Sequence, residues 1–126
     1  MPKPSARVST LHARVEEFAL SLPGAWPDTP WGDSVVKVGK KIFVFLGDGT
    51  DPYVTVKLPE TRDHALSLPG ATLPGYGLGA HGWVSIPLAG LPAKEADVLF
   101  DFVEESYRTV APKKLVKELD ARLPEA

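Results

Sequence analysis

The sequence contains no cysteine, and this absence excludes several chemistries at once. Disulfide bonds, a thiolate nucleophile and cysteine-ligated zinc or iron–sulfur sites are all ruled out. Long apolar runs are missing too, because the longest, residues 42–46, is far shorter than the roughly 18 residues that cross a bilayer. Residues 1–5 have no apolar segment behind them, so we expect no secretory signal. We therefore expect a cytoplasmic protein without a membrane partner.

The sequence also lacks an excess of positive charge. Fourteen Lys and Arg residues stand against sixteen Asp and Glu residues, which gives a formal net charge of −2 and a pI near 5.9. Domains dedicated to nucleic-acid binding more often have a pI above about 9. DNA binding by this chain would therefore require a local basic surface.

What the chain does have is enough apolar sequence for one folded domain. Hydrophobic residues make up 44% of the 126 positions, which is sufficient for a sizeable core. The 13 prolines and 11 glycines lie mostly between periodic segments, a position typical of turns. We expect a single domain over residues 1–126, with residues 1–8 as a flexible arm.

Four segments have the apolar spacing of helices, in which side chains three or four positions apart share a face. In residues 9–22, Leu11, Val15, Phe18 and Leu22 form such a face, and Pro23-Gly24 ends it. The same kind of spacing predicts further helices over residues 60–68, 93–110 and 112–122.

The apolar period changes to two in the middle of the chain, as in β-strands. Residues 35–38, 41–46 and 53–58 predict a three-stranded antiparallel meander, and residues 83–88 predict a fourth strand. The order α-βββ-α-β-α-α predicts an α+β fold, a two-layer sandwich with an antiparallel sheet covered by helices on one face.

The pattern makes two further predictions, one about the faces of a strand and one about a loop. Within residues 41–46, strict alternation places Ile42, Val44 and Leu46 on one face and Phe43 and Phe45 on the other. Trp26 and Trp31 lie in a proline-rich segment that is expected to be a loop.

The motifs do not indicate an enzyme. Gly77-x-Gly79-x-x-Gly82 matches the dinucleotide fingerprint as a string, but that site needs a preceding strand and a following helix. Here a loop precedes and a strand follows. No pair of histidines has the i, i+4 spacing of two metal ligands on one helix face. We expect no catalytic residue, no metal and no cofactor.

Clustered lysines indicate a candidate DNA-binding surface. Lys40 and Lys41 are expected at a hairpin tip, and Lys113, Lys114 and Lys117 at the start of the last helix. Two protruding basic elements could hold DNA phosphates between them. Alternatively, these lysines only solvate the surface and blunt an exposed hairpin. The candidate DNA-contact residues are Lys37, Lys40, Lys41, Lys57, Lys113, Lys114 and Lys117.

Aromatic residues form a second candidate site. Tyr76, His81 and Trp83 lie in a glycine-rich loop that runs into a strand. Large rings in loops can line a small-ligand pocket or stack on nucleic-acid bases. Alternatively, they plug the open end of a two-layer sandwich. We hypothesise that these three residues line a concavity between the loop and the sheet edge.

Five short segments resemble the MmcQ/YjbR-like family of small bacterial proteins, over about residues 10–120. They are Thr29-Pro-Trp-Gly-Asp, Val36-Lys-Val-Gly-Lys-Lys-Ile-Phe, Val54-Thr-Val-Lys-Leu-Pro, Ala80-His-Gly-Trp-Val-Ser-Ile and Glu105-Ser-Tyr. Many family members have the histidine and tryptophan adjacent, whereas Gly82 separates them here. The resemblance implies a CyaY-like fold and a "double wing" that binds DNA, and it supplies no catalytic residues.

We therefore expect a non-enzymatic domain that binds DNA weakly. The alternative is a module that binds a small molecule, linked to resistance to a toxic compound. A third possibility is a scaffold that works only through a protein partner.

Overall fold

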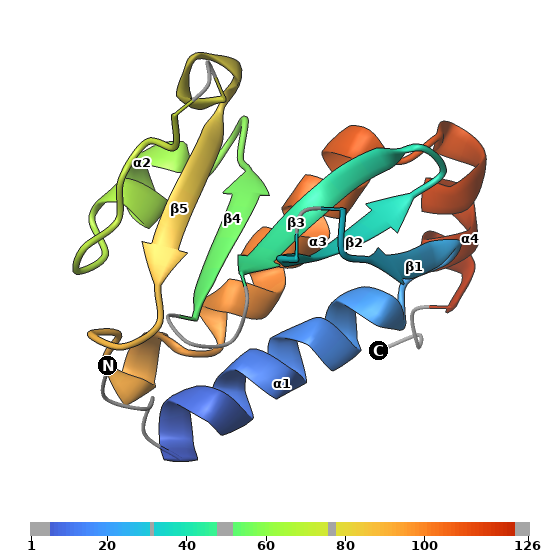
Figure 1. The fold of residues 1–126 in the computed structure, drawn as a ribbon. Coiled ribbons are helices and arrows are strands. Elements are labelled where there is room, and N and C mark those ends of the chain that lie inside the picture. The colour runs from blue at the N-terminus through green and yellow to red at the C-terminus, as the bar shows by residue number, and fades with distance from the viewer. Residues whose placement is uncertain (1–5, 31, 48–51, 76–77, 123–126) are drawn as a thin grey trace.

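The computed structural model describes residues 6–30, 32–47, 52–75 and 78–122. Its helices and strands follow one another as shown in Figure 1. In chain order they are α1 (Ala6–Leu20), β1 (Ala25–Asp28), β2 (Ser34–Val38), β3 (Lys41–Gly47), β4 (Tyr53–Lys57), α2 (Arg62–Leu66), β5 (Trp83–Pro87), α3 (Val98–Val110) and α4 (Lys113–Arg122). Two 3-10 helices, η1 (Gly79–His81) and η2 (Ala93–Glu95), precede β5 and α3.

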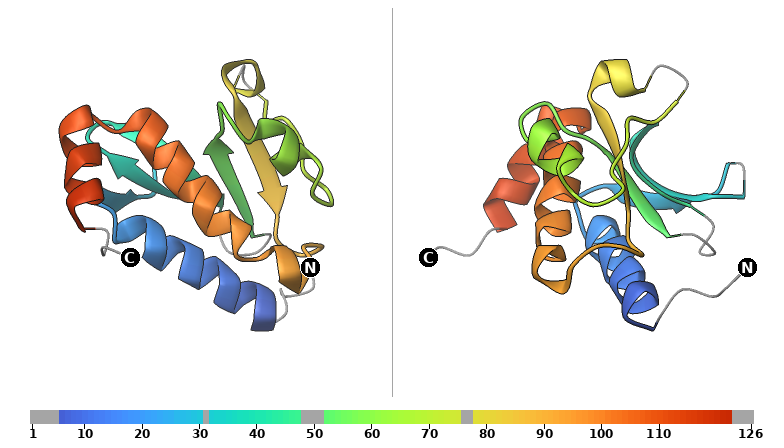
Figure 2. Two further views of the ribbon diagram at one scale, coloured as in Figure 1. Left: turned by 180° about the vertical axis from the view of Figure 1, so that it is seen from behind. Right: turned by 90° about the vertical axis from the view of Figure 1, so that its left-hand side faces the viewer.

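The five strands form one sheet in the order β1-β2-β3-β4-β5, and every neighbouring pair is antiparallel. Helices α1 and α3 lie across one face of this sheet (Figure 2). The opposite face, which we call the open face, carries no helix within the described residues. The predicted two-layer α+β sandwich is confirmed.

The hydrophobic core lies between the sheet and the helices. Alternate strand residues supply one side of it, because successive side chains of a strand point to opposite faces. The helices supply the other side from their apolar stripes. Fully buried examples are Val36, Val54, Val56, Val84 and Ile86 from the sheet and Val15, Leu99, Val103 and Tyr107 from the helices.

Strand β1 lies where the sequence predicts a proline-rich loop, so that prediction is wrong for its four residues. Ala25 pairs with Val38 and Asp28 with Val35 along β2. Pro27 is tolerated because β1 is an edge strand and the missing N–H has no further strand to bond. Local sequence does not reveal this strand, since its pairing depends on β2.

Phe43 also departs from the prediction. The register shifts so that Val36 faces Val44 and Lys37 faces Ile42, which leaves Phe43 as the extra residue of a β-bulge. Both Phe43 and Val44 therefore face the core, and the Phe43 ring packs edge-on against Tyr107 with centroids 5.3 Å apart. Strict alternation fails at this point because a bulge shifts the period by one residue.

The observed boundaries of two helices differ slightly from the predicted boundaries. Helix α1 begins at Ala6, and Val8 is only 3% exposed, so residues 6–8 belong to the helix rather than to a flexible arm. The segment predicted as one helix over residues 93–110 is split into η2 and α3.

Among the helices of the described ranges, none has the length and apolarity needed to cross a membrane.

Two residues of α3, one on either side of Ser106, attach the helix to other parts of the chain. The Glu105 carboxylate accepts hydrogen bonds from the N–H of Glu60 (2.9 Å) and the hydroxyl of Thr61 (2.8 Å), just before α2. The buried Tyr107 hydroxyl donates to the carbonyl oxygen of Pro23, and burial raises the pKa of Tyr107. These bonds fix α3 relative to the segments that follow α1 and β4.

Candidate functional site

The β2–β3 turn presents two of the predicted lysines. Gly39 opens the turn with φ +63°, a left-handed conformation that favours glycine. The indole N–H of Trp26 donates to the Gly39 carbonyl oxygen (2.9 Å) and so ties the turn to β1. Lys40 and Lys41 are both exposed at this tip, where their charges are available to a partner.

The start of α4 presents three more. The Pro112 carbonyl accepts hydrogen bonds from the N–H groups of Leu115 and Val116, which begins the helix directly after the proline. Leu119 is buried against the core and Leu115 packs against it. The lysines at positions 113, 114 and 117 therefore lie on the outer side of α4 and are exposed.

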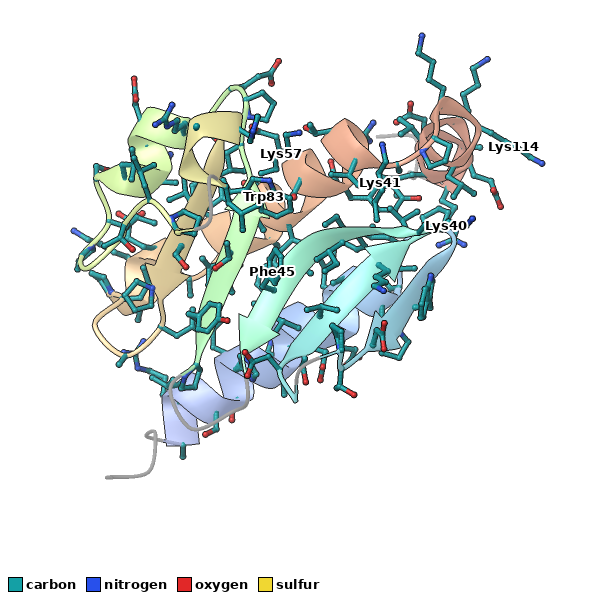
Figure 3. The ribbon with its side chains drawn as sticks, turned by 45° about the horizontal axis from the view of Figure 1, so that its top comes forward. Lys40, Lys41, Phe45, Lys57, Trp83 and Lys114 are labelled. Carbon is teal, nitrogen blue, oxygen red and sulfur yellow. The ribbon has the colours of Figure 1, made fainter. Side chains whose placement is uncertain are left out.

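These two elements lie at the same end of the molecule. A Cβ placed on Gly24 would stand 2.8 Å from a methyl carbon of Leu115, so α4 packs directly on the segment that enters β1. The next residue, Ala25, pairs with Val38, the last residue before the turn. Figure 3 shows Lys40, Lys41 and Lys114 at the same end of the molecule. We call this surface the basic end, and it contains Lys40, Lys41, Lys113, Lys114 and Lys117.

Lys37 is placed differently from the basic end. Its ammonium nitrogen lies 2.8 Å from the carboxylate of Asp28 and 5.1 Å from the ring centroid of Trp26, both on β1. The hydrogen bond from Lys37, together with one from the N–H of Thr29, holds the pKa of Asp28 below its usual value. The charge of Lys37 is thus already balanced on the open face.

Lys57 and two of the predicted ring-bearing residues, His81 and Trp83, lie in or next to β5. Lys57 is half-buried and pairs across the sheet with Trp83. Trp83 is 8% exposed, and its ring packs edge-on against Phe45 with centroids 5.4 Å apart (Figure 3). His81 is exposed in η1, and Tyr76 lies outside the described residues. A pocket shared by these aromatics stays a prediction.

The structure instead contains a cavity of about 710 Å³ on the open face. Its formation depends on the chain before η1, because Thr72 pairs with Ser85 through two backbone hydrogen bonds and so extends the sheet past β5. The chain then returns at Leu78, whose carbonyl accepts the N–H of Trp83. The lining includes Asp33, Phe45, Tyr53, Thr55, Pro74, Leu78 and Ser85.

Sequence reasoning missed this cavity, although a signal for it was present. Alternation in β4 places Tyr53 and Thr55 opposite the core residues Val54 and Val56. In β3, Phe45 likewise faces away from the core. Aromatic residues on a sheet face without a helix to cover it are typical of a binding surface.

The sequence predicts no metal site at the histidines and no dinucleotide site at the glycine motif of residues 77–82. Within the described ranges, no three His, Asp or Glu side chains come together to form a metal site. The ring of His12 is hydrogen-bonded to the Leu46 carbonyl at 2.7 Å. Gly79 lies in η1 and Gly82, with φ +92°, leads straight into β5, while Gly77 lies outside the described residues.

Comparison with known proteins identifies the family. A family model for YjbR matches residues 20–109, which is more than half of the chain. The chain belongs to the YjbR family. The resemblance noted from its short segments is therefore confirmed. A search of curated proteins found no match for this YjbR-family chain.

A solved structure supports the fold of this YjbR-family domain. The crystal structure of a protein from Pseudomonas syringae is similar, with a TM-score of 0.57 and 22% sequence identity. The match covers 78% of this chain and 97% of that one. At this level of identity the likeness concerns the fold alone, and function must be argued from the site.

Proposed function

We propose that this YjbR-family domain is a non-enzymatic protein that binds DNA weakly through the phosphate backbone. The observation that supports the proposal is the position of the basic end, where the β2–β3 turn and the start of α4 lie together. All five of its lysines are exposed, two at the β2–β3 turn and three on α4. A pair of such elements can contact phosphates on either side of a groove.

The charges around the basic end favour a local positive surface despite the net charge of −2. Arg108 of α3 forms ion pairs with Glu104 (3.2 Å) and with Asp120 of α4 (2.8 Å). Arg108 therefore offsets one of these two negative charges, and the three side chains together carry a formal charge of −1. Glu118 of α4 remains exposed and reduces the attraction, which is consistent with weak binding.

The expected binding is electrostatic and depends strongly on salt. Five phosphate contacts should give a slope of about −4.5 for log affinity against log salt. We expect a Kd of about 1–100 µM for duplex DNA without a specific site. Lysine is a point charge without the bidentate geometry of arginine, so little sequence preference is expected.

A titration of a labelled DNA duplex at several salt concentrations tests this function. Lys40→Gln and Lys114→Gln should each weaken binding and reduce the salt slope by about 0.9. Two matched variants serve as controls. Lys37→Gln removes a lysine that is paired with Asp28, and Lys94→Gln removes an exposed lysine in η2, outside the basic end. Neither should change the slope.

Two outcomes would refute DNA binding at the basic end. One is the absence of binding by the wild type at about 20 mM salt, where phosphate contacts are strongest. The other is equal loss of affinity in all four lysine variants, because it would show that only overall charge matters.

A second candidate function is the binding of a small molecule, such as a toxic compound to which the protein gives resistance. A separate observation favours it, namely the cavity of about 710 Å³ on the open face. Ligand pockets commonly have volumes of about 300–1,000 Å³ and mostly apolar linings with a few polar groups. The cavity has both features.

A further inference from the structure

We propose that the cavity on the open face binds an organic cation, a compound with a flat apolar body and a positively charged amine. This inference rests on the second candidate function above and is independent of the basic end. It follows from three properties of the lining, namely its aromatic wall, its pair of hydroxyl groups and its single carboxylate.

The aromatic wall suits a flat apolar body. Phe45 of β3 and Tyr53 of β4 both line the cavity. The edge-on contact with Trp83 holds the Phe45 ring in place, and a Cβ on Gly47 would stand 2.7 Å from the Tyr53 ring, so that ring is also packed. Fixed rings bind a flat ligand at low entropic cost, and their faces attract cations.

The hydroxyl pair supplies hydrogen-bond acceptors. Thr55 of β4 and Ser85 of β5 lie side by side, with their hydroxyl oxygens 2.5 Å apart. One hydroxyl donates to the other, and each oxygen has two lone pairs. The pair can therefore accept a further hydrogen bond from the N–H group of a ligand.

The carboxylate sets the sign of the ligand's charge. Asp33 is half-buried and is the one charged side chain in the described part of the lining. No basic side chain within the described residues forms an ion pair with it, whereas Asp28 on β1 is paired with Lys37. A carboxylate without a counter-ion in a partly enclosed apolar cavity attracts a cation and repels an anion. The cavity should therefore reject phosphates and carboxylic acids.

Three probes with the same apolar body and different charges test the proposal. They are 3-(2-naphthyl)propylamine, 3-(2-naphthyl)propan-1-ol and 3-(2-naphthyl)propionate, each titrated into ¹⁵N-labelled protein. We expect the amine to shift the amide signals of Thr55 and Ser85. Its Kd should be about three- to tenfold lower than that of the alcohol, with the carboxylate weakest, as for a partly screened ion pair.

A charge-removing variant locates the effect. Asp33→Asn should raise the Kd of the amine to that of the alcohol while leaving the Kd of the alcohol unchanged. Asp101→Asn is the matched control, because Asp101 is exposed on α3, in the helical layer on the other side of the sheet. It should leave all three Kd values unchanged. Retention of the remaining amide spectrum in both variants shows that each is folded.

The outcomes separate the ligand class from the function itself. Equal binding of the amine and the alcohol by the wild type would overturn the proposed preference for cations, while small-molecule binding would stand. Failure of all three probes to shift the cavity amides would overturn both. An equal loss of amine affinity in the two Asp variants would also overturn the assignment to Asp33.

Discussion

The buried hydroxyl group of Ser106 donates a hydrogen bond to the carbonyl oxygen of Phe43, and this bond joins α3 to β3. The same hydroxyl accepts a hydrogen bond from the N–H of Lys57 in β4 (2.9 Å). The paired register of β3 and β4 ends at Val44 and Val56, which are the sequence neighbours of Phe43 and Lys57. Ser106 therefore bridges the two strands where their pairing ends. Figure 1 shows the two strands diverging from each other.

Replacement of Ser106 by alanine should destabilise the fold. The change leaves the N–H of Lys57 and the carbonyl of Phe43 without their shared partner at a position that is 0% exposed. We expect a loss of about 1–3 kcal/mol in the free energy of unfolding, measured by urea denaturation. Ser67→Ala is the control, because its hydroxyl is exposed and should change stability by no more than about 0.5 kcal/mol. Equal midpoints for the two variants would contradict this role for Ser106.

Glu105→Ala should loosen the start of α2 without unfolding the protein. Thr61 precedes this short helix but its own side chain does not cap it, and the Glu105 carboxylate accepts the N–H groups of Glu60 and Thr61 instead. Glu105 is half-buried, so we expect a local loss of about 1 kcal/mol. That loss corresponds to about fivefold faster hydrogen exchange at these two amides. The control, Glu104→Ala, breaks only the pair with Arg108 and should leave both exchange rates unchanged.

The ion pair between Asp28 and Lys37 should make the free energy of unfolding depend on pH. Because the pKa of Asp28 is lower in the folded state than in the unfolded state, the ionised carboxylate stabilises the fold above the unfolded pKa. This contribution is lost as the pH falls through the folded pKa.

Lys37→Met removes the largest cause of the shift, so the pKa of Asp28 should rise toward 3.8 in a carboxyl ¹³C NMR titration. The N–H of Thr29 still donates to Asp28 and leaves part of the shift in place. Lys41→Met, at an exposed position of the neighbouring turn, should leave the titration unchanged. An unaltered titration in Lys37→Met would show that the ion pair does not form in solution.

Local periodicity was sufficient to predict most of the elements. The stripe that includes Leu11 and Val15 gave the first helix, and the alternation of Val54 and Val56 gave a strand. These patterns are reliable because each reports which side of one element is buried, a property that neighbouring residues encode. Periodicity assigns no role to the segment Glu105-Ser-Tyr, which forms part of the family resemblance. In the structure, these three residues hydrogen-bond to three separate parts of the chain, namely the segment before α2, strand β3 and Pro23.

Composition alone determined that this chain has no disulfide and no thiol chemistry, and its local periodicities favoured an α+β sandwich. Tertiary structure decided which charges are available, since Asp28 balances Lys37 while Lys40 and Lys114 stay exposed. It also decided that residues 25–28 form a strand, that Phe43 turns into the core, and that Asp33 lines a cavity with residues from β3, β4 and β5. These features depend on partners distant in sequence, and strand pairing across a sheet leaves no periodic signal in either strand by itself.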